Sequence, residues 1–319
     1  MGNGHDRIGA AVDVGSNSVH LVVGSIDGTD GRTAVTAMVD ESELLGLGDV
    51  VDAHGEITPE AQERLIIALH RYATVAQAYA ARHLTIVATE PLRRAANREL
   101  IQAHVHAATG LDLQVLRHED EGLLTLLGVT GGATVERPLL VVDIGGGSSE
   151  FVLASPTAPP QVGALATGSA RLTKQLVSHD PPTAIEIEAL REEALELVAT
   201  TPEGRVERAV MVGGTATNLL KVAASQWGET LVDHAALAEA YAVIGSTPAD
   251  EISERYVINR RRAGMLAAGA ALVEAFMDRF GIAIVEVSRV SLREGAILAR
   301  ERAGVGWLAE LSNLAVRAS

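Results

Sequence analysis

Two stretches of similar sequence decide the fold of this chain: Asp13-Val14-Gly15-Ser16-Asn17-Ser18 and Asp143-Ile144-Gly145-Gly146-Gly147-Ser148-Ser149-Glu150. Each lies between two apolar runs of strand length, so each predicts a hairpin with an aspartate at the end of its first strand. Both copies share the order strand, Asp-x-Gly-x-x-Ser, strand, which indicates an internal duplication with one copy opening each of two domains. The four apolar runs are Ile8 to Val12, Val19 to Ile26, Leu139 to Val142 and Phe151 to Ala154.

Predicted helices and strands alternate after each hairpin, which is typical of an α/β fold. Thr58-Pro59 marks a helix start, with Thr58 as N-cap. The polar, proline-containing segment 135–138 separates the two halves. We therefore expect one domain over residues 1–135 and a second over residues 136–319, with the last helix able to pack back on the first domain. Other predicted elements are strands at 84–88, 113–116, 209–212 and 282–287, helices at 93–109 and 262–280, and a helix opening at Ser291.

The composition narrows the classes of protein and ligand. With 319 residues, 47% hydrophobic and 21% charged, the chain is long enough for two globular domains. It contains no apolar run of about eighteen residues and no basic, apolar leader, so we expect a cytoplasmic protein without membrane partners. The net charge of −15 argues against a nucleic-acid partner. Since the chain has no cysteine, a metal would have oxygen or imidazole ligands, which favours a hard cation such as magnesium.

The two turns are candidates for a phosphate site. Glycines allow backbone N–H groups to approach an anion closely, and two such turns facing each other could cradle a phosphate chain. Asp13 and Asp143 end the strands before the turns and offer the hard oxygen that magnesium prefers. A glycine-rich turn with an aspartate can also serve only to form the bend. Because the same pattern occurs twice in the chain, we favour a phosphate site over a simple bend.

Hydrolysis also needs a base that orients and deprotonates water. Glu121 and Glu150 are the candidates, although Glu121 could equally belong to an ordinary acidic first turn of a helix. Arg93 lies near a predicted helix start, where it could reach an oxyanion, or it could be a solvated surface arginine.

Taken together, these residues resemble the exopolyphosphatase and guanosine pentaphosphate phosphohydrolase (Ppx/GppA) family. The resemblance covers nearly the whole chain, and the matching motifs occur in the family's order. They are Asp13 to Ser18 with His20, Ala88-Thr89 through Arg93 to Asn97, Glu119-Asp120-Glu121, Asp143 to Glu150, Gly168 to Thr173, Gly213 to Thr217 and Leu292-Arg293-Glu294-Gly295.

The resemblance implies two actin-like (ribonuclease H-like) domains of the acetate and sugar kinase-like superfamily, with a cleft between them that holds the substrate. It implies that Glu121 positions or deprotonates the attacking water, with Glu150 as the second catalytic carboxylate. The metal, Mg²⁺ or Mn²⁺, is expected on Asp13, Asp143 and Glu150. The resemblance also implies a homodimer. The residues expected to bind substrate phosphate are Ser16, Asn17, Ser18, Arg93, Gly145, Gly146, Gly147, Ser148, Gly213, Gly214 and Thr215.

Several positions depart from the family pattern. Leu123 and Gly46 stand where the family usually has arginines, Arg289 replaces an acidic residue, and Gly264 replaces an acid in the long helix. We expect the chain to be a short form of the family, without the appended helical domains of longer relatives. The expected activity is therefore magnesium-dependent removal of terminal phosphate from short inorganic polyphosphate. The alternatives are a guanosine pentaphosphate 5'-phosphohydrolase, a protein that binds polyphosphate or an alarmone without hydrolysis, and, least favoured, a kinase or ATPase of the same superfamily.

Overall fold

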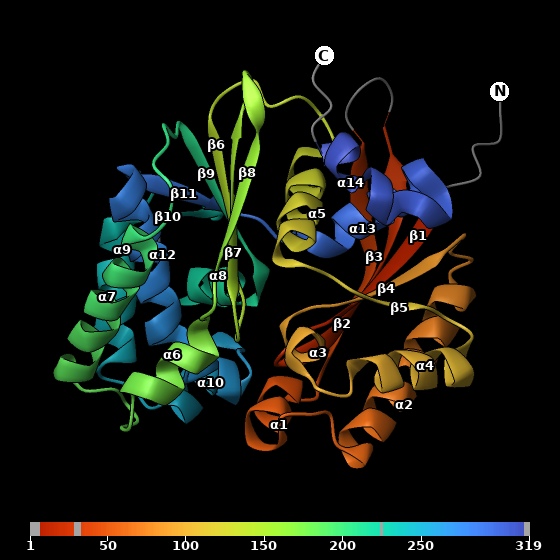
Figure 1. Ribbon diagram of the computed structural model, residues 1–319. Coiled ribbons are helices and arrows are strands. Elements are labelled where there is room, and N and C mark those ends of the chain that lie inside the picture. Colours follow the sequence, from red (N-terminus) through yellow and green to blue (C-terminus); the bar gives the residue numbers. More distant parts are fainter. Residues whose placement is uncertain (1–6, 29–32, 224–225, 316–319) are drawn as a thin grey trace. The chain divides into compact units, whose positions relative to one another are not determined.

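In the computed structural model, which describes residues 7–28, 33–223 and 226–315, the chain divides into two α/β units. Unit 1 comprises the residues up to Thr134 together with those from Val290 onward, and unit 2 comprises Val135–Arg289. Each unit has its own sheet and its own helices (Figure 1), which confirms the prediction of an α/β fold. Within the described part of the chain, no helix is long and apolar enough to cross a membrane.

The sheet of unit 1 has the order β3-β2-β1-β4-β5. β1 and β2 form the predicted antiparallel hairpin, whereas β1, β4 and β5 run parallel. The carboxyl ends of these three parallel strands therefore lie at one edge of the sheet. The strands are β1 (Arg7–Val14), β2 (Ser18–Asp27), β3 (Ala34–Leu44), β4 (Leu84–Ala88) and β5 (Leu113–Val115). The helices are α1 (Leu47–His54), α2 (Pro59–Ala78), α3 (Glu90–Arg94), α4 (Arg98–Thr109), α5 (His118–Thr130), α13 (Leu292–Ala303), η1 (Gly304–Gly306) and α14 (Trp307–Ala315).

Strand alternation sends the side chains of β1 to two different layers. Ala10 and Val12 belong to the apolar core that β1 and β2 share with α2 and α4. Gly9 lies on the opposite face, where a Cβ atom at this residue would come within 2.7 Å of the Ile297 side chain on α13. Helices α2 and α4 thus cover one face of the sheet, and α13 packs against the other.

The predicted single helix over residues 93–109 is wrong, because two helices, α3 and α4, occupy this region. The break lies at residues 95–97. Asn97 holds it in place: its side-chain amide accepts a hydrogen bond from the Ile57 N–H at 3.0 Å and donates to the Ile57 carbonyl at 2.8 Å. Arg93 consequently lies near the end of the short helix α3, not at the start of a long one.

Helices α5 and α13 cross at very short range. A Cβ atom at Gly295 would lie 1.9 Å from the carbonyl oxygen of Leu124, and one at Gly128 would lie 2.3 Å from that of Ser291. Both glycines are needed because any side chain would displace a helix backbone. This crossing fixes the position of α5, which carries Glu121 in its first turn.

Replacing Gly295 with alanine should lower the free energy of unfolding by about 1–3 kcal/mol, because the added methyl group overpacks the crossing. Urea unfolding followed by circular dichroism measures this change. Gly306→Ala is the matched control, since a Cβ atom there would meet no atom within 4 Å. An unchanged unfolding midpoint for Gly295→Ala would contradict the described crossing.

Unit 2 repeats the plan of unit 1 with one additional strand. Its sheet has the order β10-β11-β9-β6-β7-β8, in which β6 and β7 form the second predicted hairpin and β6, β9 and β11 run parallel. The strands are β6 (Leu139–Ile144), β7 (Ser149–Ser155), β8 (Ala158–Leu165), β9 (Arg208–Val212), β10 (Leu231–Asp233) and β11 (Ile284–Val287). The helices are α6 (Ser169–Leu176), α7 (Ala184–Ala199), α8 (Gly213–Val222), α9 (His234–Ile244), α10 (Ala249–Tyr256), α11 (Arg260–Ala263) and α12 (Leu266–Phe280).

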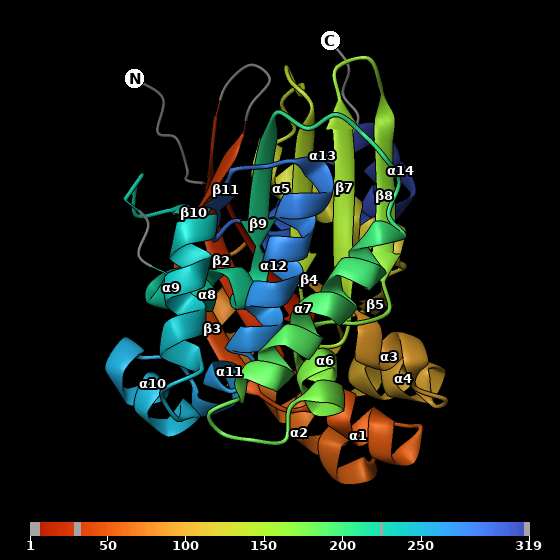
Figure 2. The same ribbon diagram turned by 90° about the vertical axis from the view of Figure 1, so that its left-hand side faces the viewer.

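The core of unit 2 lies between one face of this sheet and its helices. Leu140 and Val142 of β6 share an apolar cluster with residues of α7, α9 and α12, of which Phe276 is fully buried. Figure 2 looks onto these helices. The long helix predicted over residues 262–280 is divided into α11 and α12, with residues 264–265 between them.

Candidate active site

The two acid-bearing turns have the same local geometry, as the duplicated sequence predicts. The Gly15 N–H donates to the Ser18 carbonyl at 3.1 Å, and the Gly145 N–H donates to the Ser148 carbonyl at 3.0 Å. Each turn follows the carboxyl end of a central strand. The hairpin register pairs Asp13 with His20 and Asp143 with Glu150. His20 and Glu150 are therefore equivalent positions in the two copies.

In unit 1, the carbonyl groups of the turn are held by the start of α1. The Gly48 N–H donates to the Ser16 carbonyl at 2.8 Å, and the Gly46 N–H donates to the Asn17 carbonyl at 3.0 Å. In a planar trans peptide the N–H points opposite to the C=O. The N–H groups of Asn17 and Ser18 therefore point away from α1 and can face an anion.

The turn of unit 2 is held in the same way by the start of α6. The Gly145 carbonyl accepts from the Ser169 N–H at 2.9 Å, and the Gly146 carbonyl accepts from the Ala170 N–H at 3.0 Å. The N–H groups of Gly146 and Gly147 consequently point away from α6. In each turn, two successive backbone N–H groups thus point away from the helix that holds the turn, an arrangement that can accept an anion.

Gly46 explains one departure from the family pattern. It has φ of 62°, a left-handed conformation that glycine adopts without strain. An arginine at this position would have to adopt that conformation, so the backbone of this chain favours glycine where the family usually has an arginine. Leu123, the other replaced arginine, is only 4% exposed within α5 and packs as a core residue.

The serine and asparagine side chains of the first turn have different surroundings. The Ser16 hydroxyl donates to the buried Glu90 carboxylate at 2.5 Å, so its proton is directed to that acid. The Asn17 Oδ1 atom is buried and has no hydrogen-bond partner among the residues described. Because buried polar atoms rarely stay unsatisfied, Asn17 is a group that a ligand can engage.

Ser18 belongs to a hydrogen-bond chain that includes the C-terminal segment. Arg293 donates to His20 Nδ1 at 3.1 Å and to Asp40 Oδ1 at 3.2 Å. Since an arginine can only donate, His20 Nδ1 accepts, and His20 Nε2 carries the proton and donates to the Ser18 hydroxyl at 2.7 Å. The Ser18 O–H can in turn donate to an acceptor such as a phosphate oxygen.

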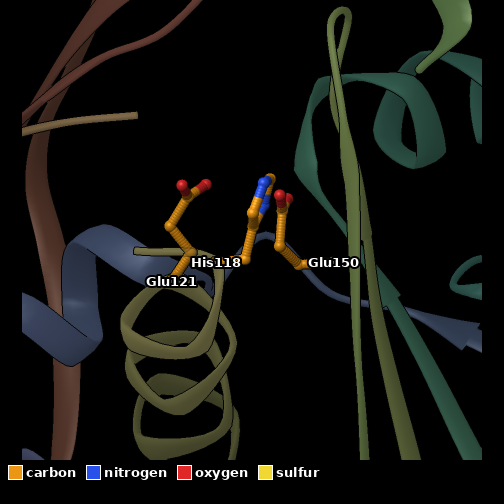
Figure 3. Close-up of side chains that lie close together, drawn as sticks. All are labelled: His118, Glu121 and Glu150. Atoms are coloured by element: carbon orange, nitrogen blue, oxygen red, sulfur yellow. The ribbon is translucent and has the colours of Figure 1, made fainter. Parts of the chain in front are cut away.

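The base candidate Glu121 lies at the start of α5, where it is 5% exposed. Arg93 makes three contacts here: its guanidinium pairs with Glu121, donates to the Leu116 carbonyl at 2.8 Å and donates to His118 Nδ1 at 3.0 Å. Figure 3 shows Glu121 and His118 projecting from this first turn of α5. Arg93 and Glu121, both predicted from sequence, are thus brought into direct contact.

Sequence reasoning did not select His118. Its Nδ1 accepts a hydrogen bond from an arginine, so the neutral ring carries its proton on Nε2 and is a hydrogen-bond donor there. Coordination of a metal by Nε2 would require the Arg93 contact to be given up. The spacing His118-x-x-Glu121 on one helical turn is the signal that could have found it.

In unit 2, the start of α8 lies against Asp143. A Cβ atom at Gly213 would come within 2.3 Å of Asp143 Oδ1, and the φ of Gly213 is 85°. The hydroxyl of Thr215 lies 3.1 Å from that of Ser169, which opens α6. The predicted residues Asp143, Gly213 and Thr215 are thus gathered with the glycine turn at the carboxyl edge of the sheet. Ser148 and Glu150 are buried, and Glu150 is carried by β7 (Figure 3).

Gly213→Ala should lower the free energy of unfolding by about 1–3 kcal/mol and displace the Asp143 carboxylate, because the new methyl group meets both a strained φ and Oδ1. Chemical unfolding and the magnesium dependence of activity measure the two effects. Gly214→Ala is the control, since its Cβ atom would lie no closer than 3.7 Å to its nearest neighbour, Arg262. Equal free energies of unfolding and equal magnesium dependence in the two variants would contradict this prediction.

The donor atoms of the two turns suit a hard cation. Asp13 is half-buried at the end of β1, and a Cβ atom at Gly15 would lie 4.0 Å from both Asp13 Oδ2 and the Thr89 hydroxyl. Asp143 is half-buried at the equivalent position in unit 2. These carboxylate and hydroxyl oxygens match the ligands that magnesium and manganese accept.

Comparison with known proteins shows extensive similarity. The model of the Ppx/GppA phosphatase family matches residues 22–303. Exopolyphosphatase 1 of Mycobacterium tuberculosis (strain ATCC 25618 / H37Rv) is 34% identical over 306 residues, which cover 92% of this chain and 87% of that protein. The guanosine-5'-triphosphate,3'-diphosphate pyrophosphatase of Vibrio vulnificus (strain YJ016) is 27% identical over 302 residues, 92% of this chain and 59% of that protein. A crystal structure of the Aquifex aeolicus member of the Ppx/GppA family aligns with a TM-score of 0.78 and 26% identity, covering 92% of this chain and 97% of that one. These matches confirm the resemblance of the sequence motifs.

Proposed function

The chain belongs to the Ppx/GppA phosphatase family, and from that premise we propose that it is a magnesium-dependent exopolyphosphatase acting on short inorganic polyphosphate. The reaction is hydrolysis of the terminal phosphoanhydride bond, which releases orthophosphate. The observation that carries the proposal is the ion pair of Arg93 with the buried Glu121 at the first turn of α5. This pair places a carboxylate and a cation together, as hydrolysis of a phosphate chain requires.

Glu121 has the role of the base in this proposal. Its carboxylate orients a water molecule and accepts the water's proton as the oxygen attacks the terminal phosphorus. Burial in α5 and the contact with Arg93 limit the rotation of the carboxylate. Arg93 offsets negative charge on the phosphoryl group during transfer. His118 Nε2–H adds a further donor toward phosphate oxygens.

The two glycine turns hold the phosphate chain. The outward N–H groups of residues 17–18 and 146–147 bind phosphate oxygens, and the hydroxyls of Ser18 and Ser148 add donors. The N-terminal end of α8, Gly213 to Thr215, contributes further N–H groups from the same edge of the unit 2 sheet.

Asp13, Asp143 and Glu150 are the proposed ligands of magnesium, with manganese as a substitute. When bound, the cation offsets negative charge on the phosphate chain and polarises its oxygens. The two acids at the strand ends are equivalent by duplication, and Glu150 pairs with Asp143 in the hairpin register. The proposal requires Glu121 and Glu150 to act on the same substrate molecule.

Guanosine pentaphosphate is the second candidate substrate. The Vibrio vulnificus relative is named for the pyrophosphatase reaction on that nucleotide, whereas the more similar relative of Mycobacterium tuberculosis is named an exopolyphosphatase. The higher sequence identity to the exopolyphosphatase favours polyphosphate as the substrate. The net charge of −15 favours a short chain, because a long polyanion would be repelled outside the site.

A side-by-side assay of orthophosphate release tests the substrate assignment. The purified chain is given short polyphosphate, long polyphosphate, guanosine pentaphosphate and ATP, each with magnesium and with a chelator. We expect the largest kcat/KM on short polyphosphate. A higher value on guanosine pentaphosphate would replace the first candidate with the second, and preferential transfer from ATP to an acceptor would reject both.

A further inference from the structure

A buried carboxylate that the proposed reaction does not use lies beside the first phosphate turn of unit 1, residues 15–18. Glu90 opens α3, is 4% exposed and accepts a hydrogen bond from the Ser16 hydroxyl at 2.5 Å. A buried charge is costly unless it is paired, and an anion next to a phosphate turn also repels the ligand. The place of Glu90 therefore calls for a role other than attraction of the substrate.

Arg94 and Asp52 supply the pairing that this burial requires. The Arg94 guanidinium forms an ion pair with Oε1 of Glu90, one helical turn earlier, and donates to Asp52 Oδ1 at 2.6 Å. Asp52 belongs to α1, which lies beside α3 (Figure 1). The Glu90 carboxylate is thus held at both oxygens, since Oε2 accepts from the Ser16 hydroxyl.

Ser16 is held by two helices through two different groups. Its carbonyl accepts from the Gly48 N–H of α1 at 2.8 Å, and its hydroxyl donates to Glu90 of α3. The packing around it is close as well, because a Cβ atom at Gly48 would lie 2.9 Å from the Ser16 Cβ. These contacts fix the planar peptide between Ser16 and Asn17, and with it the direction of the Asn17 N–H, which points away from α1.

The same short helix carries Arg93, to which the proposed reaction gives a role at the phosphoryl group. Successive helical residues lie about 100° apart around the axis, so Arg93 and Arg94 point to different sides of α3. Arg93 pairs with Glu121 of α5, and Arg94 pairs with Glu90. The contact of Glu90 with Ser16 therefore joins the phosphate turn to the helix that carries Arg93.

We propose that Glu90 is a positioning residue that acts through Ser16 and fixes the backbone of the first phosphate turn for a phosphate group of the substrate. This deepens the proposed function and rests on it, because the turn binds phosphate only under that proposal. The Ser16 hydroxyl then supports the turn and does not donate to the substrate. Phosphate oxygens are bound by the N–H groups of residues 17–18 and by the Ser18 hydroxyl.

Two uncharged replacements of Glu90 separate positioning from charge. Glu90→Gln can still form a hydrogen bond with the Ser16 hydroxyl, whereas Glu90→Leu cannot, and both remove the same negative charge. The ligand is a methylene-bridged analogue of tripolyphosphate, which cannot be hydrolysed at its bridges. We expect its calorimetric dissociation constant to be about three- to tenfold larger for Glu90→Leu than for Glu90→Gln, the effect of one lost hydrogen bond in an ordered site. KM for short polyphosphate should show the same ratio.

The same comparison without the Ser16 hydroxyl is the control. The double variants Ser16→Ala/Glu90→Gln and Ser16→Ala/Glu90→Leu should bind the analogue equally well, because residue 90 no longer has a hydroxyl to hold. Any change in stability or packing that leucine causes on its own is present in both pairs, so a difference confined to the first pair identifies the contact. Thermal unfolding checks that all four variants are folded. Glu90→Ala, which leaves space in place of an apolar side chain, should behave as Glu90→Leu does.

Equal dissociation constants for Glu90→Gln and Glu90→Leu would overturn the proposal, as would a difference that persists in the two double variants. The positioning role and the hydrolytic activity can fail separately. A protein that shows the expected binding pattern but releases no orthophosphate would support the role of Glu90 and reject hydrolysis. An active enzyme without that binding pattern would do the reverse.

Discussion

Replacement of Glu121 by glutamine is expected to lower kcat for phosphate release by about two to four orders of magnitude, the usual contribution of a general base. Glutamine keeps the size of the side chain but cannot accept a proton. It can still accept a hydrogen bond from Arg93, so α5 should keep its place. We expect KM to change little, because the substrate is held by other groups. Steady-state kinetics with short polyphosphate measures both quantities.

Glu119→Gln is the matched control for this variant. Glu119 lies in the same helical turn, but its side chain is 55% exposed and its ion-pair partner is the exposed Arg117. It should retain near-normal turnover. If Glu121→Gln also retained near-normal turnover, Glu121 would lose the role of the base.

Replacement of Asp143 by asparagine should raise the magnesium concentration needed for half-maximal activity by at least about 10- to 100-fold, because loss of a mere hydrogen-bond partner of a metal ligand already has an effect of that size. The substitution removes the charge and leaves the shape, so the close packing against Gly213 is preserved. A magnesium titration of phosphate release measures the shift, and thermal unfolding checks that the variant is folded.

Asp278→Asn removes a carboxylate from an exposed position of the same unit, at the end of α12. Its magnesium dependence should match that of the unaltered protein. A magnesium curve for Asp143→Asn that coincides with this control would show that Asp143 is not a ligand.

Much of the fold can be predicted because both hairpins are local. Asp13 and Asp143 follow apolar runs and precede glycines, so strand, turn and acid can be recognised within about fifteen residues. The turn geometry then repeats, because equivalent residues make equivalent hydrogen bonds. The duplicated sheets follow from the duplicated sequence.

The contacts made by distant residues could not be predicted in this way. Arg293 lies 273 residues from the histidine it contacts, and no local pattern links His20 to the C-terminal helix. The partners of Arg93 depend on the break that Asn97 creates between α3 and α4, and helical periodicity does not reveal such a break. Gly295 is required by the backbone of a neighbouring helix, which sequence spacing does not specify.

Orthophosphate release from short polyphosphate, measured with magnesium and again with excess chelator, tests the central claim most directly. The account predicts steady release with magnesium and its loss with the chelator, restored when magnesium is returned in excess. Tight calorimetric binding of the same polyphosphate, with release at background in both magnesium and manganese, would contradict it and identify a binding protein instead.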